Sequence, residues 1–253
     1  MRLASLNLLH GRSLSDGLVV VDRLQDAVGA LAADVLGLQE VDRGQPRSHG
    51  RHLTREAAEA MGAAGWRFVP ALIGTPGSGW RAAQDGDDDT TEPAYGCGLV
   101  SRYPVTAWHT IRLPAVRFRS PVLVPGPRRL LWLDDEPRVA IAAVVTTPRG
   151  PMTVATTHLS FIPGWNAVQL RRVCRALDGL PGPRVLLGDL NMPPPFPRLV
   201  SRWRPLAKVA TYPSTGPRVQ IDHVLGSGRL PRVTAVEART VAVSDHQALV
   251  VEL

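Results

Sequence analysis

The segment VLLGDLNM, residues 185–192, places three apolar residues and a glycine before an acid, a leucine and an amide. The apolar run predicts a buried strand over residues 184–190. Because side chains two residues apart in a strand point to the same face, Asp189 and Asn191 would project together where the strand ends. An acid at a strand end is often a simple turn former. Whether this pair belongs to a turn or to a polar site therefore depends on what the other strands carry.

The rest of the chain alternates many short apolar strands with a few helices. Residues 74–93, with the run DGDDD at 85–89, predict an irregular, solvated loop, and the Pro- and Arg-rich residues 114–137 predict a long surface excursion. No segment has the composition of a linker, so we expect one domain over residues 1–253. Hairpins and crossovers together predict a mixed α/β (α+β) sheet protein. The expected strands cover residues 3–8, 35–41, 66–73, 95–102, 105–113, 139–146, 152–157, 184–190, 219–225, 232–240 and 247–253, and the expected helices cover residues 22–31, 53–61 and 165–177.

The chain of 253 residues carries a formal net charge of +7. Such a charge favours anionic partners, including nucleic acid, phospholipid surfaces and phosphorylated small molecules. Lys208 is the only lysine, and an arginine-rich composition with abundant Ala, Gly and Pro is also typical of a GC-rich genome. The charge therefore indicates an anionic partner but does not decide which kind of anionic partner it is.

Cysteine usage and hydropathy argue against a zinc protein, a disulfide-rich protein and a membrane-spanning protein. Cys97 and Cys174 are isolated and lack CxxC or Cys/His spacing, which favours two core residues over a zinc site or a disulfide framework. The N-terminal run MRLASLNLLHG is followed at once by polar residues, and no apolar segment has the length of a membrane span. We therefore expect a cytoplasmic protein without stable membrane insertion, and the sequence leaves its oligomeric state open.

Most of the expected strands begin or end at an acid, amide or imidazole side chain. Carboxylate and amide oxygens are suitable ligands for Mg²⁺ or Mn²⁺, and histidines can donate hydrogen bonds to a phosphate. Hydrolysis of a phosphodiester needs a cation, a base that aligns water, and donors for the charge that builds on phosphate oxygens. The set therefore predicts a metal-dependent phosphohydrolase site. Its members are Asn7, Glu40, His158, Asp189, Asn191, Asp222, Asp245 and His246.

These residues lie in motifs that resemble one known family. The order GDxN, then IDH, then a C-terminal SDH is the most specific part of the pattern. On these motifs the sequence resembles a small bacterial member of the endonuclease/exonuclease/phosphatase superfamily, which is deoxyribonuclease I-like. The resemblance implies a four-layered sandwich, in which two mixed β-sheets pack face to face and are flanked by helices. The motifs are SLNLLHG with Asn7, LGLQEVD with Glu40, YGCGLVSRYP, TTHLS with His158, LLGDLNMPP with Asp189 and Asn191, QIDHVL with Asp222, and SDHQALVVEL with Asp245 and His246.

The same resemblance implies catalytic roles for five residues. Asp189 is expected to orient and deprotonate the attacking water, and Asn191 to hold that water or a phosphate oxygen. Asp222 is expected to fix the tautomer of His246. His246 and His158 would then donate hydrogen bonds to phosphate oxygens as negative charge builds. On this interpretation Asp189 and Asn191 share a face because both must reach one phosphorus atom.

The resemblance also implies a cation site and a substrate contact. Glu40, helped by Asn7 and Asp245, is expected to bind Mg²⁺ or Mn²⁺. Arg47 and Ser48, in DRGQPRSHG, match a pattern of small bacterial members and are expected to touch substrate phosphate.

Several surface residues receive weaker interpretations. Arg138 opens a strand after a proline, and we expect it to cap the hairpin instead of facing the site. Basic and aromatic residues near the middle of the chain suggest a surface for single-stranded nucleic acid, although such residues in a loop more often cover core. They are Arg117, Phe118, Arg119 and Trp132.

The substrate class follows less directly from the sequence. The segment TYPSTGPRVQIDHVL differs from the penultimate motif of abasic-site endonucleases and is closer to bacterial phosphodiesterases and to sphingomyelinase or tyrosyl-DNA phosphodiesterase-like branches. The apolar hairpin that the lipid branch often adds is not evident. We therefore expect a phosphodiesterase acting on nucleic acid, with a phospholipid or inositol-phosphate phosphodiesterase or phosphatase as the alternative. A non-catalytic binding protein on the same scaffold is a third hypothesis, against which the intact residue set argues.

Overall fold

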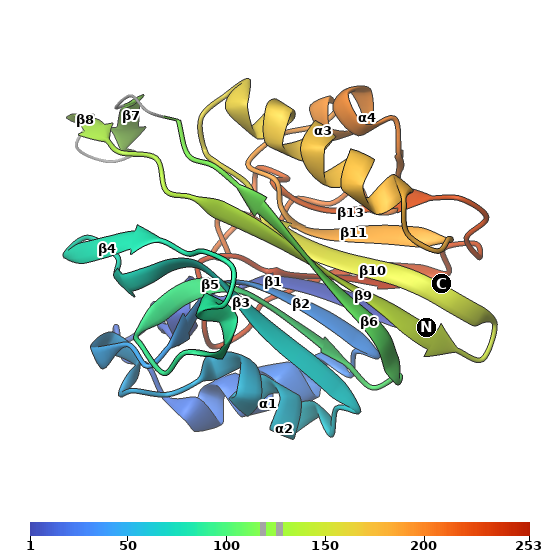
Figure 1. Cartoon of the computed structure of the whole chain (residues 1–253), viewed down its shortest axis with the longest axis horizontal. Helices are drawn as coiled ribbons and strands as arrows, with labels where there is room; N and C mark the ends of the chain where they lie inside the picture. The colour runs from blue at the N-terminus through green and yellow to red at the C-terminus, as the bar shows by residue number, and fades with distance from the viewer. Residues whose placement is uncertain (117–119, 125–128) are drawn as a thin grey trace.

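The computed structural model describes residues 1–116, 120–124 and 129–253, and it consists of four layers (Figure 1). Helices α1 (Val21–Leu31) and α2 (Leu53–Met61) cover a seven-stranded sheet. A six-stranded sheet packs on the other face of that sheet and is covered in turn by α3 (Trp165–Asp178) and α4 (Phe196–Ser201). The four-layered sandwich of two mixed sheets is therefore confirmed.

In the seven-stranded sheet, only β1 and β2 form a parallel pair, and the other neighbours are antiparallel. The register aligns Asn7 with Gln39, so both strands carry their polar ends to the same edge. The strand order is β14 (Ala235–Arg239), β15 (Ala248–Glu252), β1 (Arg2–Asn7), β2 (Val35–Arg43), β5 (Ala94–Ser101), β3 (Gly65–Thr75) and β4 (Gly79–Ala82).

The six-stranded sheet repeats this plan, with β10 and β11 as its parallel pair. A separate two-stranded hairpin of β7 (Ser120–Val124) and β8 (Arg129–Leu133) projects from the sandwich at the same end as β4 (Figure 1). The strand order of the sheet is β12 (Arg204–Pro205), β13 (Asp222–Ser227), β11 (Arg184–Asp189), β10 (Gly150–His158), β9 (Arg138–Thr147) and β6 (Val105–Leu113).

The two sheets approach each other closely at β2 and β10. A Cβ atom on Gly37 would lie 2.6 Å from the Thr156 hydroxyl oxygen, so only glycine fits there. Next to it, the Gln39 amide donates to the same hydroxyl at 2.8 Å. The rest of this interface is apolar and includes Leu3, Val35, Leu99, Val154 and Leu187, all fully buried. Close apolar packing of this kind fixes the two parallel pairs relative to each other.

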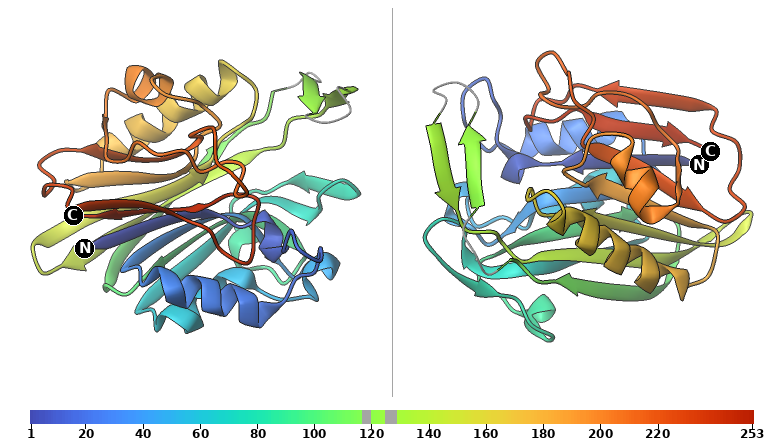
Figure 2. Two further views of the ribbon diagram at one scale, coloured as in Figure 1. Left: turned by 180° about the vertical axis from the view of Figure 1, so that it is seen from behind. Right: turned by 90° about the horizontal axis from the view of Figure 1, so that it is seen from above.

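The chain termini lie side by side at the end of the sandwich opposite to β4 and the β7–β8 hairpin (Figure 2). The Met1 amino group donates to the carbonyl oxygen of Leu253 at 3.1 Å. Among the described residues, no helix has the length and apolar character that crossing a membrane requires.

Each expected strand has a counterpart, and the helices expected at 22–31, 53–61 and 165–177 are confirmed to within one residue at each end. Cys97 and Cys174 are buried and free, as predicted. The loop prediction for residues 74–93 was wrong, because this segment holds β4 and the short helix η3 (Asp87–Asp89). Residues 114–137 hold β7 and β8, and the proline-rich loop after β11 holds α4.

The segment expected to be a solvated acidic loop is held by arginines, three of which come from β2, β3 and β6 and one from β4 within the segment. We call this group the arginine–aspartate cluster. It pairs Arg81 with Asp87, Arg112 with Asp85 and Asp88, and Arg67 with Asp88, and it includes Arg43, which donates to backbone carbonyls of the same turn. Such long-range partners cannot be read from local composition. Arg117, Phe118 and Arg119 lie outside the described residues.

Candidate active site

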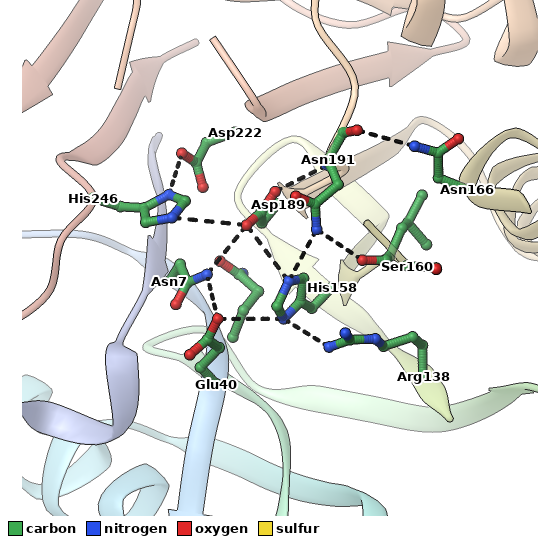
Figure 3. Close-up of polar contacts among 12 residues, drawn as sticks. Asn7, Glu40, Arg138, His158, Ser160, Asn166, Asp189, Asn191, Asp222 and His246 are labelled. Atoms are coloured by element: carbon green, nitrogen blue, oxygen red, sulfur yellow. Dashed lines mark hydrogen bonds and ion pairs between the residues drawn. The ribbon is translucent and has the colours of Figure 1, made fainter. Parts of the chain in front are cut away.

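The carboxyl ends of the two parallel strand pairs meet at one edge of the sandwich and bring four of the predicted residues together (Figure 3). Asn7 ends β1 and Glu40 lies near the end of β2 in the seven-stranded sheet. His158 ends β10 and Asp189 ends β11, directly opposite each other in register. The Asn7 amide donates to both Glu40 and Asp189, each at 3.1 Å, and so connects the two sheets.

Antiparallel neighbours bring three more residues to the same edge. Asp222 begins β13 directly opposite Asp189. His246 precedes β15, which pairs with β1, and Asn191 follows Asp189 by two residues. Residues that are far apart in the sequence therefore meet at this edge, because each of these strands either ends or begins there.

The backbone adopts positive φ angles at three positions around these side chains, and two of them are not glycine. Glu40 has φ 54° next to a register shift between β2 and β5, and Asn191 has φ 49°. Gly188 has φ 144°, and a Cβ atom there would lie 2.0 Å from the carbonyl oxygen of Thr157. Non-glycine residues rarely adopt positive φ, and such strain is concentrated at functional sites. The glycine of GDxN is thus required for β11 to approach β10.

Asp189 lies at the centre of the group. Its Oδ2 atom lies 3.5 Å from Nε2 of His158 and 3.9 Å from Nε2 of His246, while Oδ1 accepts from the Asn191 backbone N–H at 2.9 Å. The residue is only 2% exposed. Burial and the nearby charge of Asp222 raise the pKa of Asp189 to about 7. A carboxylate with such a pKa can accept a proton near neutral pH.

Asp222 controls the charge of His246. The His246 Nδ1–H donates to Asp222 Oδ2 at 2.8 Å, and the Thr211 hydroxyl donates to the same oxygen. Burial acts to lower the pKa of His246, but the hydrogen bond and the charge of Asp222 outweigh it and raise the pKa to about 9. His246 is therefore protonated at neutral pH. The other oxygen, Asp222 Oδ1, is buried without a hydrogen-bond partner among the described residues.

Donors from Arg138 and Asn191 face the two ring nitrogens of His158. The Arg138 Nη1 atom lies 3.3 Å from Nδ1, and the Asn191 Nδ2 atom lies 3.2 Å from Nε2. Burial, followed by the charge of Arg138, lowers the pKa of His158 well below its ordinary value. The expectation that Arg138 caps the hairpin was wrong, because its guanidinium turns into the site (Figure 3). No local sequence signal distinguished these two positions of the side chain.

The donor set around Glu40 suits a hard divalent cation. Burial is the main factor that raises the pKa of Glu40, and the charge of Asp245 adds to it. The carboxylates of Glu40 and Asp245, with the Asn7 amide, match the oxygen ligands that Mg²⁺ and Mn²⁺ prefer. A bound cation would offset the negative charge of the buried Glu40 carboxylate. Asp189, Asp222 and His246 also present ligand atoms within 4.8 Å of one another. Because the imidazole Nδ1 of His246 already donates to Asp222, we interpret this second group as one that handles protons.

The two residues expected to contact substrate are placed differently. The Arg47 guanidinium donates to both oxygens of Asp42 at 2.7 and 2.9 Å, lies over the Tyr95 ring, and keeps a third of its side chain exposed. Ser48 is fully buried, and its hydroxyl donates to the carbonyl oxygen of Gln45. Arg47 therefore stays a candidate for substrate contact, whereas Ser48 has a structural role in this turn.

Several supporting residues were not anticipated. The Asn166 amide donates to the carbonyl oxygen of Asn191 at 2.9 Å and so supports its strained backbone (Figure 3). The Ser244 hydroxyl donates to the carbonyl oxygen of Asn7 and accepts from the His246 N–H. The Tyr212 ring packs 4.8 Å from the His246 ring. Ser244 belongs to the SDH motif and was within reach of sequence reasoning, whereas Asn166 and Tyr212 carry no such signal.

A model of the Endonuclease/Exonuclease/phosphatase family matches residues 4–246. Among solved structures, an endonuclease/exonuclease/phosphatase from Beutenbergia cavernae has a TM-score of 0.69 and 24% identity, with 99% of this chain and 70% of that chain covered. Sphingomyelinase C from Streptomyces griseocarneus has a TM-score of 0.61 and 16% identity, covering 99% and 96%. Truncated TDP2 from Caenorhabditis elegans has a TM-score of 0.60 and 16% identity, covering 99% and 95%. A search of curated proteins found no match.

Proposed function

Because the chain belongs to the endonuclease/exonuclease/phosphatase family, whose members hydrolyse phosphoester bonds, we propose that it is a metal-dependent phosphodiesterase acting on nucleic acid. The observation that carries the proposal is the environment of Asp189. This carboxylate is buried, has a pKa of about 7, and contacts Asn7 while facing the two histidines. A base of this kind beside two imidazole donors is what in-line attack of water on a phosphodiester requires.

In the proposed mechanism, Asp189 accepts a proton from the attacking water as its oxygen bonds to phosphorus. The bond between phosphorus and the leaving oxygen breaks, which gives a phosphomonoester and an alcohol whose oxygen takes up a proton from solvent. Asn191, fixed by its contacts with Asp189 and the Leu159 carbonyl oxygen, positions the water or a phosphate oxygen. Both side chains lie at the same edge of the sandwich.

The two histidines would stabilise the charge that builds on the phosphate. Protonated His246, held by Asp222, donates to one non-bridging oxygen, and a ring N–H of His158 donates to another. When bound by Glu40, Asn7 and Asp245, Mg²⁺ or Mn²⁺ would neutralise negative charge on the phosphate oxygens.

The charge of the chain favours an anionic substrate, and nucleic acid is the polyanionic member of that class. The net charge is +7, and a polyanionic strand would gain affinity from the release of its counterions. Hydrolysis of a phospholipid or an inositol phosphate is the alternative function, and binding without catalysis is the third.

The test is hydrolysis of bis-p-nitrophenyl phosphate and of labelled DNA with Mg²⁺, Mn²⁺ or a chelator. We expect metal-dependent cleavage by the wild type and a loss of about 10²-fold or more in kcat for Asp189→Asn, because general base catalysis contributes at least this much. Asp26→Asn is the matched control, since Asp26 is an exposed acid on α1. Equal activity of the two variants would contradict the assigned role of Asp189.

The substrate class is tested by comparing DNA with sphingomyelin vesicles and inositol phosphates. We expect cleavage of DNA, with an affinity that falls steeply as salt is added. Cleavage of only the lipid or inositol substrates would overturn the nucleic-acid assignment. Binding of DNA without cleavage of any substrate would support the non-catalytic alternative.

A further inference from the structure

A hollow with a volume of about 330 Å³ lies beside the proposed active site, between β4, the adjoining ends of β6 and β9, and α3. Three of the residues that line it are arginines, namely Arg112, Arg138 and Arg172, and none is acidic. We call this feature the arginine pocket. Its size is at the lower end of the range of small-ligand sites.

Arg112 lines this pocket, but other residues neutralise its charge. Its guanidinium donates to carboxylate oxygens of Asp85 and Asp88, each at 3.0 Å, and to the Pro70 carbonyl oxygen at 3.1 Å. These partners satisfy its charge within the protein. The positive charge available to a ligand therefore comes from the other two arginines.

Arg138 is a buried cation with one nitrogen that the described part of the chain leaves without a hydrogen bond. The side chain is 8% exposed, and its Nε atom is buried without a hydrogen-bond partner among the described residues. Glu136 forms an ion pair with it at 3.8 Å, and although burial acts to lower its pKa, the charges of Glu136, Asp135 and Glu40 raise the pKa and favour the charged form. Because a buried donor without an acceptor is costly, a phosphate oxygen bound beside Arg138 would supply an acceptor that the described residues do not.

Arg172 is an exposed cation on α3 that forms no hydrogen bond or ion pair with any residue whose side chain the structure describes. The helix is held against the pocket by two hydrogen bonds. The Trp165 indole and the Gln169 amide both donate to the Pro114 carbonyl oxygen, and Pro114 lines the pocket. Arg172 is therefore fixed at the rim by its backbone, while its side chain stays available.

We propose that the arginine pocket binds the phosphate that neighbours the scissile phosphodiester on a nucleic-acid strand. Arg138 connects the two sites, because it lines the pocket and also contacts Nδ1 of His158. A strand whose scissile phosphate faces His158 would present its next phosphate to Arg138 and Arg172. This inference rests on the proposed function, and it predicts a preference for substrates that carry two adjacent phosphates.

Binding to chelator-treated protein tests the pocket without turnover. The probes are a thymidine dinucleotide with no terminal phosphate, the same dinucleotide with a 5′-phosphate, and the same with a 3′-phosphate. For the wild type we expect one of the phosphorylated forms to bind at least tenfold more tightly than the unphosphorylated form. This ratio should fall to about one in Arg172→Gln and persist in Arg171→Gln, an exposed arginine on the same helix that does not line the pocket.

The ratio of kcat/KM between phosphorylated and unphosphorylated dinucleotides should follow the ratio of affinities. Equal affinity for all three probes in the wild type would overturn the inference, as would a preference that survives in Arg172→Gln. Hydrolysis of bis-p-nitrophenyl phosphate separates this result from the proposed function, because that substrate has no second phosphate. If the protein hydrolysed it but bound all three dinucleotides equally, the phosphodiesterase function would be supported and phosphate binding in the arginine pocket would be contradicted.

Discussion

The proposed active site and the arginine–aspartate cluster both gather carboxylates in a small volume, but they differ in what compensates the charge. In the cluster each carboxylate has an arginine partner. Arg81 donates to both oxygens of Asp87 at 2.6 and 2.9 Å, and Arg112 joins Asp85 to Asp88. In the proposed active site, Asp189 has no arginine among its hydrogen-bond partners in the described part of the chain and instead faces amide and imidazole groups.

This difference separates the arginine–aspartate cluster, which stabilises the fold, from the proposed active site, whose side chains are proposed to react. The arginine partners lower the pKa of Asp87, and the carboxylate of that residue is permanently charged and satisfied. Burial raises the pKa of Asp189 to about 7, and Asp222 Oδ1 is left without a partner among the described residues. Charge that the fold leaves uncompensated is available to a substrate, a cation or a proton.

The largest effect expected from this comparison is the loss of activity in Asp222→Asn. Without the carboxylate, burial still lowers the pKa of His246 while the hydrogen bond and the charge of Asp222 that raise it are lost, so the imidazole holds its proton less tightly at neutral pH. We expect kcat for bis-p-nitrophenyl phosphate to fall by about 10²- to 10⁴-fold, the range typical of a lost acid or base. Circular dichroism checks that the fold is kept, and a decrease of less than tenfold would argue against the role of this pair.

The sequence predicted which residues meet at the edge of the proposed active site better than it predicted the cluster, for a physical reason. Asn7, Glu40, His158, Asp189 and Asp222 all lie where an apolar strand begins or ends, so a local pattern marks each of them. The topology then needs only to bring strand ends together. Arg138 also begins a strand, but whether a long side chain turns inward or outward depends on the neighbouring β10, which local sequence does not encode.

The arginine–aspartate cluster could not be predicted as a whole because most of its partners are far apart along the chain. Arg43 and Arg112 lie on β2 and β6, whereas the acids lie on the turn at 85–89. Glycine and aspartate in that turn are typical of a solvated loop when they are considered alone. Only the packing of β3 against β5 and of β6 against β9 brings the arginines over it.

A second prediction concerns stability instead of activity. Arg43 is buried and donates to the carbonyl oxygens of Asp87 and Asp88 and to the Thr90 hydroxyl. Arg43→Met keeps the apolar stem but leaves these acceptors unpaired, so we expect the free energy of unfolding to fall by about 2–3 kcal/mol, as for hydrogen bonds from a charged donor. Urea unfolding measures this change, and kcat should stay within threefold of the wild type.

The matched control for Arg43 is Arg23, which forms a surface ion pair with Asp16. Since exposed pairs contribute about 0–1 kcal/mol, Arg23→Met should change the stability much less. Equal losses in the two variants would show that the cluster is no more than a set of surface pairs. A large loss of activity in Arg43→Met with unchanged stability would contradict the claim that the cluster stabilises the fold and takes no part in activity.

The smallest expected effect is the pH dependence of stability at His52, at the edge of the same cluster. The His52 Nδ1 atom accepts from the Arg55 N–H at 3.4 Å at the start of α2, and its ring packs edge-on against Trp66 and Phe68. Burial, followed by the charges of Arg43 and Arg55, lowers its pKa to about 4. A proton on Nδ1 would also remove the acceptor that caps the helix.

The sign of the effect follows from proton binding. An unfolded histidine takes up its proton near pH 6.5, whereas folded His52 resists protonation until about pH 4, so stability falls as the pH drops through this window. Because the ring is partly exposed, we expect wild type to lose about 1 kcal/mol more than His52→Gln between pH 7 and pH 5. His10, whose pKa is also lowered to about 4, is present in both proteins and cancels in the difference. Arg43→Met should shrink the loss at His52, because it removes one of the charges that oppose protonation, and an unchanged loss would show that burial and Arg55 set this pKa without Arg43.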